Sequence, residues 1–204
     1  MSMRSFLTTA AAAAVVIAAM TGLTLYFTGA FNSGTGYRSL VGGHFVMSTQ
    51  DGRQLTDLDL KGKPFAIFFG FTQCPDVCPT TMLEVANIMN KLGPDADKMK
   101  FLFVSVDPER DTPAILKQYL ASFDERIIGL VGTPEQTANI VRAYRVYFAK
   151  VPTKESYTIN HTATVFLMDA TGHLAKTISF SEDEKTKLAK IRGLLRDAPL
   201  ASTH

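Results

Sequence analysis

The sequence predicts an α/β domain, with a central sheet flanked by helices, that follows an N-terminal transmembrane helix. Strand-like and helix-like segments alternate from about Leu40 onward. An uncharged stretch precedes them, and the only two cysteines lie where an apolar strand gives way to a helix. Because the chain has 204 residues, it has room for one ordinary domain and an accessory segment.

The N-terminal segment predicts a membrane anchor. Arg4 is followed by an uncharged stretch from Ser5 to Phe31 that is rich in Ala, Val, Ile, Leu and Met. A spanning helix needs about 20 mainly apolar residues, whereas the apolar region of a signal peptide has about 7 to 15. The length therefore favours an uncleaved anchor over a cleaved export signal or a buried core helix. Basic residues that flank a membrane span stay on the cytoplasmic side, so Arg4 should lie in the cytoplasm. In a bacterium, the chain should then cross the inner membrane once, and the residues after the span should lie in the periplasm.

The domain organisation follows from this reading. We expect a membrane anchor over residues 1–31, a tether containing Gly and Ser over 32–39 and a folded domain over 40–204. The formal net charge is +2, and the Lys and Arg residues are scattered along the chain. Because no basic stripe is present, we expect no nucleic-acid partner.

The first half of the domain predicts a hairpin and then a βαβ unit. Residues 45–60 form the hairpin about an Asp51-Gly52 turn, and the apolar run Phe65–Phe71 predicts a fully buried strand. Residues 79–92 show apolar positions at helical spacing, with Gly93-Pro94 as a stop signal. A second buried strand is expected over 101–106.

The second half predicts two more helices, a hairpin and a final helix. Residues 115–120 carry a helical stripe, and Thr133-Pro134-Glu135-Gln136 combines a capping threonine, a proline at the first helical position and a capping-box glutamine. Strands over 163–169 and 174–180 flank an Ala170-Thr171-Gly172 turn, and an apolar stripe over 188–195 predicts the last helix. A βαβ unit with the cysteines at its first strand-to-helix junction, followed by ββα, is the order expected of a thioredoxin-like fold.

The chemistry concentrates in the segment "FTQCPDVCP", residues 71–79, which contains Cys74 and Cys78. A purely stabilising disulfide is one interpretation, but a bridge over so short a loop removes little entropy from the unfolded chain. A proline follows each cysteine, so both cysteines should lie on a loop, with the helix starting at Pro79. Cys78 would then lie beside a helix N-terminus, which favours a thiolate. The spacing is compatible with a metal site or a redox disulfide.

A histidine could complete a metal site. Of His44, His161, His173 and His204, only His161 lies just before the strand whose entry loop approaches the cysteines in a thioredoxin-like fold. Two thiolates suit Cu(I), and an added imidazole gives a trigonal set that can also hold Cu(II). Structural zinc normally takes four ligands, so a set of three favours copper. Zinc stays possible if Asp76 provides a fourth ligand.

Three motifs resemble the Sco/SenC family: "GFTQCPDVCPTTM", "FVSVDPERDTP" and "NHTATVFLMDATG", within about Gly42 to Leu195. The resemblance implies a thioredoxin-like domain tethered by one transmembrane helix, with copper bound by Cys74, Cys78 and His161. It also implies a role in assembling the copper centre of cytochrome c oxidase, by delivering metal, by reducing the target's cysteines, or both. The implied partners are the copper-site subunit of the oxidase and a periplasmic copper donor chaperone. The chain has Asn160 where an Asp commonly precedes the histidine in this family.

A different class of function stays open. A periplasmic thiol:disulfide oxidoreductase, or a redox sensor, could use the Cys74/Cys78 pair as nucleophile and resolving thiol without requiring His161. Apart from such exchange, we do not predict an enzyme.

Two further features have both a functional and a plain structural interpretation. The charged residues after the second buried strand could border the site or form a solvated turn; they are Asp107, Glu109, Arg110 and Asp111. An apolar rim of Phe71, Val77 and Pro79 could dock a partner, although core packing explains Phe71 equally well.

Overall fold

The structure is a computed structural model that describes residues 17–24 and 40–197. Residues 17–24 form a short helix, and the other positions of the predicted anchor, the tether over 32–39 and His204 lie outside the described residues. No helix within the described ranges is both long enough and apolar enough to cross a membrane.

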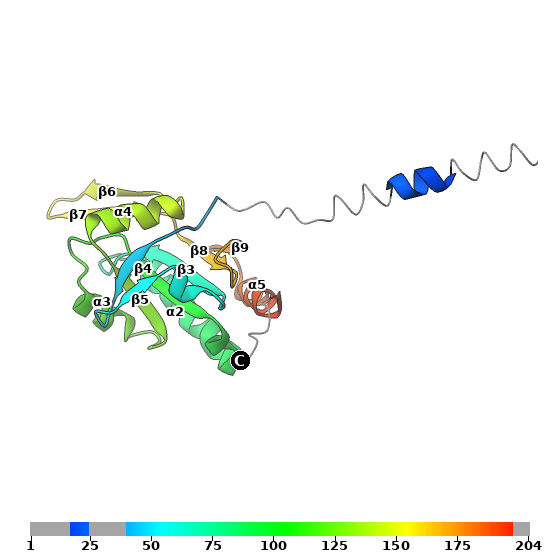
Figure 1. Cartoon of the computed structure of the whole chain (residues 1–204). Helices are drawn as coiled ribbons and strands as arrows, with labels where there is room; N and C mark the ends of the chain where they lie inside the picture. Colours follow the sequence, from blue (N-terminus) through cyan, green and yellow to red (C-terminus); the bar gives the residue numbers. More distant parts are fainter. Residues whose placement is uncertain (1–16, 25–39, 198–204) are drawn as a thin grey trace, which may run out of the picture. The chain divides into compact units, whose positions relative to one another are not determined.

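A mixed seven-stranded sheet organises the domain from residue 40 onward (Figure 1). The strand order is β2-β1-β5-β4-β3-β8-β9, with β3, β4 and β5 parallel and their outer neighbours β1 and β8 antiparallel to them. The strands are β1 (Val46–Thr49), β2 (Gln54–Thr56), β3 (Phe65–Gly70), β4 (Lys100–Ser105), β5 (Ile127–Val131), β8 (Thr164–Met168) and β9 (Leu174–Ser179). Strands β6 (Phe148–Pro152) and β7 (Tyr157–His161) form a separate antiparallel hairpin.

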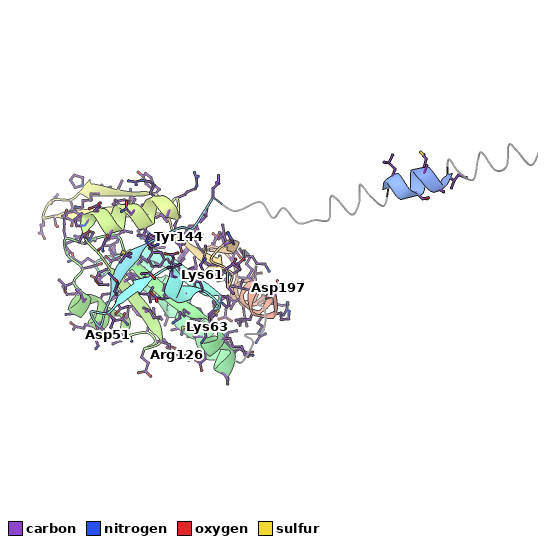
Figure 2. All side chains as sticks on the ribbon, viewed as in Figure 1. Asp51, Lys61, Lys63, Arg126, Tyr144 and Asp197 are labelled. Carbon is purple, nitrogen blue, oxygen red and sulfur yellow. The ribbon has the colours of Figure 1, made fainter. Side chains whose placement is uncertain are left out.

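Helices cover both faces of the sheet. They are α2 (Val77–Leu92), α3 (Pro113–Leu120), α4 (Pro134–Ala143) and α5 (Glu184–Asp197), with short 3-10 segments η1 (Leu58–Leu60) and η2 (Gly93–Lys98). Helices α2 and α5 lie beside one another, and the buried Lys187 of α5 pairs with Glu84 of α2. Tyr144, which is labelled in Figure 2, follows α4 on the opposite face. Its ring packs on Phe69 and Phe166 of the sheet.

The central strands form the core because their side chains are apolar on both faces. All six residues of β3 are buried, and five of the six in β4. This is the pattern expected of parallel strands covered on both sides. Helix α3 packs closely on β5 at Gly129, where an added Cβ would lie 2.6 Å from Leu120 and 2.7 Å from Leu116. By contrast, Arg126 projects from the turn before β5 and pairs with Asp124 (Figure 2).

The predicted order of elements is confirmed where the sequence pattern is strong. The hairpin about Asp51-Gly52, both buried strands, the β8–β9 hairpin and the helix beginning at Pro134 are all present. Three strands, β5, β6 and β7, have no counterpart in the sequence-based prediction. Strand β5 is a short apolar run, IIGLV, that is interrupted by Gly129. The β6–β7 hairpin consists mainly of exposed and partly buried positions, with neither an apolar run nor a strict alternation.

The cap of α4 gives a direct test of local stability. The Thr133 side chain accepts a hydrogen bond from the Gln136 backbone N–H, and Gln136 reciprocates at the Thr133 N–H. We expect Thr133→Ala to lower the free energy of unfolding by about 1 kcal/mol in urea denaturation. The exposed Ser122→Ala serves as the control, and an equal change in both variants would argue against the cap.

Candidate metal centre

The two cysteines lie at the junction between β3 and α2. Cys74 occupies the loop after Phe71, where its backbone N–H donates to the Phe71 carbonyl at 3.2 Å. Cys78 lies in the first turn of α2, which begins at Val77, so the prediction that Cys78 lies on a loop and that the helix starts at Pro79 is wrong. Proline is tolerated within the first helical turn, because its missing N–H would have no intrahelical partner there.

Gly70, the last residue of β3, makes room for Cys78. A Cβ at Gly70 would lie 2.8 Å from the Cys78 sulfur and 3.0 Å from the Phe103 ring. The absence of a side chain therefore lets the sulfur settle against the end of the sheet, where Cys78 is fully buried. Cys74 is only partly buried, and both thiols are free.

His161 reaches the cysteines from the β6–β7 hairpin. It is the last residue of β7. The sequence-based expectation that His161 lies in the loop before the next strand is therefore wrong. Its Nε2 lies 3.3 Å from the Cys78 sulfur, and its Nδ1 lies 3.2 Å from the Thr162 carbonyl oxygen. A proton on Nδ1 that is donated to this carbonyl leaves Nε2 as the free ligand atom. The rings of Phe68 and Phe71 contact the imidazole edge-on, with centroids 5.9 Å away.

The three predicted ligands thus come together. The Cys74 and Cys78 sulfurs and a His161 nitrogen all lie within 4.8 Å of one another, and within the described ranges this is the single such group of potential metal ligands. Asp76 is not part of the group, which leaves zinc without its usual fourth ligand. Two soft thiolates and one imidazole are a donor set that suits copper in either oxidation state.

The two thiols differ in their electrostatics. A hydrogen bond from the Cys78 thiol, outweighing the effect of burial, lowers the pKa of Cys74 to about 4, and His161 and two backbone N–H groups add to the shift. The hydrogen bond to Cys74, together with burial, raises the pKa of Cys78. The expectation that Cys78 is the favoured thiolate is therefore wrong. Burial of Cys78 and its role as hydrogen-bond donor outweigh the helix N-terminus at which it lies.

The charged loop after β4 borders the site and is not a solvated turn. Asp107 and Asp111 are 0% and 3% exposed. Asp107 pairs with Arg110 and accepts a hydrogen bond from the Tyr157 hydroxyl at 2.7 Å. The Arg110 guanidinium lies 3.8 Å above the Tyr157 ring and donates to the Tyr157 carbonyl at 2.9 Å. Because Tyr157 begins the strand that ends at His161, this network holds the histidine strand against the domain.

The predicted apolar rim is only partly present. Phe71 is 1% exposed and belongs to the core, so it cannot contact a partner, whereas Val77 and Pro79 are partly exposed. His44 and His173 lie elsewhere: His44 pairs with Asp57, and His173 contacts Thr171 at the β8–β9 turn.

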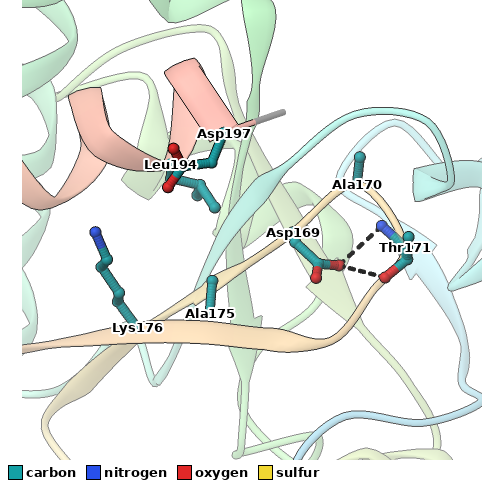
Figure 3. A pocket seen from close by; sticks show the side chains of 7 residues that line it. All are labelled: Asp169, Ala170, Thr171, Ala175, Lys176, Leu194 and Asp197. Atoms are coloured by element: carbon teal, nitrogen blue, oxygen red, sulfur yellow. Dashed lines mark hydrogen bonds between the residues drawn. The ribbon is translucent and has the colours of Figure 1, made fainter. Parts of the chain in front are cut away.

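A cleft of about 220 Å³ lies away from the cysteines, between the β8–β9 turn and α5 (Figure 3). Its lining includes Asp169, Lys176 and Asp197. The Asp169 carboxylate accepts hydrogen bonds from the Thr171 backbone N–H and hydroxyl, at 2.8 and 2.6 Å. Asp169 therefore closes the turn, and the described residues that line the cleft include no group of metal ligands comparable to the cysteine site.

Fold and site together define a class of protein: a thioredoxin-like domain with a Cys–Cys–His metal site at the end of its central strands. The SCO1/SenC family model matches residues 33–196. The chain belongs to the SCO1/SenC family.

Relatives of known sequence agree with this assignment. The chain is 37% identical over 157 residues to the mitochondrial protein SCO2 of Saccharomyces cerevisiae, covering 74% of this chain and 52% of the yeast protein. It is 32% identical over 156 residues to an SCO2-like protein of Rickettsia felis, covering 75% and 76% of the two chains. The chain spans about half the length of the yeast relatives that it matches.

Solved structures of relatives include copper-bound forms. ScoI of Bradyrhizobium japonicum with copper bound is 46% identical with a TM-score of 0.71, covering 76% of this chain and 99% of the other. Yeast Sco1 with copper bound is 34% identical with a TM-score of 0.72, covering 79% and 91%.

The low pKa of Cys74 predicts an unusual pH profile for its reactivity. Because the pKa is lowered to about 4, the thiolate is present above that pH and is lost only as the pH falls through it. We expect iodoacetamide to alkylate Cys74 of the reduced, metal-free protein at a nearly constant rate between about pH 8 and pH 5, whereas an ordinary thiol slows about tenfold per unit. Mass spectrometry of digested protein would measure this. In urea, the alkylation rate of both cysteines should depend on pH as that of an ordinary thiol does. If the alkylation rate of Cys74 in the folded protein has its midpoint at about pH 8.5, the prediction is wrong.

Proposed function

We propose that this protein binds copper through Cys74, Cys78 and His161 and delivers it to the copper-site subunit of cytochrome c oxidase. The observation that carries the proposal is the convergence of two sulfurs and one imidazole nitrogen within 4.8 Å, from a loop, a helix and a separate hairpin. Copper-bound relatives up to 46% identical support copper as the metal. Membership of the SCO1/SenC family supports the proposed role in oxidase assembly.

The geometry suits a site that both binds and releases its metal. Cys74 and His161 are partly exposed, so an acceptor could approach the metal from their side, whereas Cys78 is buried. Three ligands leave copper open to a further ligand from an acceptor. Copper in this proposal is cargo. The periplasmic location, the single inner-membrane span and a copper donor chaperone as second partner remain predictions from the sequence.

A second function is favoured by the thiol electrostatics. A Cys74 thiolate with a pKa of about 4, hydrogen-bonded by the Cys78 thiol, is the arrangement of a nucleophile and its resolving partner. The same pair could reduce a disulfide in the acceptor subunit before metal transfer. In that exchange two electrons pass to the acceptor's disulfide, and a Cys74–Cys78 disulfide forms.

Copper titration of the reduced domain, residues 38–204, tests the ligand assignment. We expect one Cu(I) per chain and a thiolate-to-Cu(II) charge-transfer band. His161→Ala should weaken Cu(II) binding more than about a hundredfold, because even groups that merely orient a ligand contribute 10- to 100-fold, while disulfide exchange persists. Cys74→Ser should abolish tight Cu(I) binding, because one thiolate and one imidazole are a poor site for a soft ion.

His173→Ala is the matched control, since His173 is an exposed histidine at the β8–β9 turn. It should retain wild-type affinity for both ions. Unchanged Cu(II) affinity in His161→Ala would remove the histidine from the site, and wild-type Cu(I) affinity in Cys74→Ser would place the site elsewhere.

Mixing with the soluble domain of the oxidase copper subunit separates delivery from reduction. Copper-loaded protein should transfer its metal to an acceptor whose cysteines are reduced, as measured by metal analysis after separation. Metal-free, reduced protein should reduce an oxidised acceptor only if the second function holds, as measured by thiol counting. An acceptor that gains neither copper nor thiols would contradict both functions.

A further inference from the structure

Asp111, in the loop between β4 and α3, lies buried behind the cysteine loop. Its side chain accepts hydrogen bonds from the Thr72 backbone N–H at 3.1 Å, the Thr72 hydroxyl at 2.6 Å and the Ser105 hydroxyl at 2.6 Å. All three groups act as donors, which is the environment of an ionised carboxylate, because that group only accepts. Asp111 thus connects the cysteine loop to the end of a core strand.

The two partners of Asp111 belong to two segments that border the metal centre. Thr72 is two residues before Cys74 in the same loop. Ser105 is the register partner of Gly70, against which the Cys78 sulfur rests. Further backbone bonds fix the loop that carries Asp111, from the Val106 N–H to the Gly70 carbonyl and from the Asp111 N–H to the Asp107 carbonyl. The carboxylate therefore fixes the distance between the cysteine loop and the strand beneath it.

Among the described residues, the negative charge of Asp111 has no cationic hydrogen-bond partner, unlike that of Asp107. Asp107 pairs with the Arg110 guanidinium, whereas the three groups that donate to Asp111 are neutral. At 3% exposure Asp111 is also poorly screened by solvent. The charge lies beside the site, because Thr72, which donates to both carboxylate oxygens, is two residues before Cys74.

We propose that Asp111 is a positioning residue that holds the cysteine loop in its metal-binding geometry, and that its buried negative charge makes the site favour Cu(II) over Cu(I). The second half rests on the proposed copper-binding function. The two ions differ by one positive charge, so an uncancelled carboxylate in a poorly solvated region attracts Cu(II) more strongly. The hydrogen bonds act on both ions equally, because they order the sulfur ligand whichever ion is bound.

The positioning half is tested on the metal-free protein. Asp111→Ala removes both acceptor oxygens, so neither the Thr72 N–H nor the Thr72 hydroxyl keeps its partner on this side chain. We expect hydrogen exchange of the Thr72 amide, followed by NMR, to accelerate at least about tenfold, as loss of a hydrogen bond to a charged group predicts. Thr72→Ser keeps both donors and should exchange at position 72 like the wild type. Unchanged exchange in Asp111→Ala would overturn the positioning role, whatever the protein binds.

The charge half is tested by the ratio of Cu(II) to Cu(I) affinity. Asp111→Asn should lower this ratio about tenfold, the lower end of the effect expected of groups that surround metal ligands. Thr72→Val loses one hydrogen bond but keeps the charge, so it should weaken both affinities and leave the ratio unchanged. Glu109→Gln is the matched control, because Glu109 lies in the same loop but is exposed and paired with Lys150.

An unchanged ratio in Asp111→Asn, or an equal fall in Glu109→Gln, would overturn the charge argument. If Asp111→Asn fails to fold, Asp111→Glu keeps the charge while altering the geometry. It should weaken both ions with the ratio retained, and a changed ratio would contradict the proposal. If the wild-type protein binds no copper, the proposed copper-binding function is wrong and the charge argument falls with it. The positioning role is still tested, because amide exchange is measured on the metal-free protein.

Discussion

The metal centre depends on two buried carboxylates at the end of β4. Asp111 holds the cysteine loop through Thr72, and Asp107 holds β7, and with it His161, through Tyr157 and Arg110. Cys78 and His161 are 83 residues apart in sequence, yet the segments that carry them are both held by the same short loop. Burying a carboxylate is costly unless its hydrogen bonds are made, so these networks specify one arrangement of the loop and the hairpin.

The sheet supplies the rigid base for this arrangement. Strands β3 and β4 are apolar on both faces and pair in parallel along six residues, so their carboxyl ends finish at the same edge. Residues placed after those ends, the cysteine loop and the Asp107–Asp111 loop, are therefore brought together by strand pairing alone. Gly70 then determines how close Cys78 can approach, because any side chain there would occupy the space of the sulfur.

The contrast between the thiols connects the two candidate functions. Cys74 is partly exposed and strongly acidic, while Cys78 is buried and holds its proton. Metal binding requires the proton of Cys78 to leave, so the bound cation must compensate for burying a second thiolate. In the metal-free protein the same pair is poised for thiol chemistry. One geometry thus supports copper binding and disulfide exchange, and His161 is the residue that only the first requires.

The sequence by itself determined the order of most elements, the family and the three residues that converge at the candidate metal centre, because these depend on local patterns: apolar runs, Gly and Pro signals, the Thr133 cap and the cysteine motif. The β6–β7 hairpin left no comparable local signal, and the apolar run of β5 is short and contains Gly129. Only the tertiary structure decided which thiol is acidic, since burial and one sulfur-to-sulfur hydrogen bond outweigh the helix N-terminus. It also decided that Asp107 and Asp111 of the charged loop are buried, because their partners come from segments up to 50 residues away.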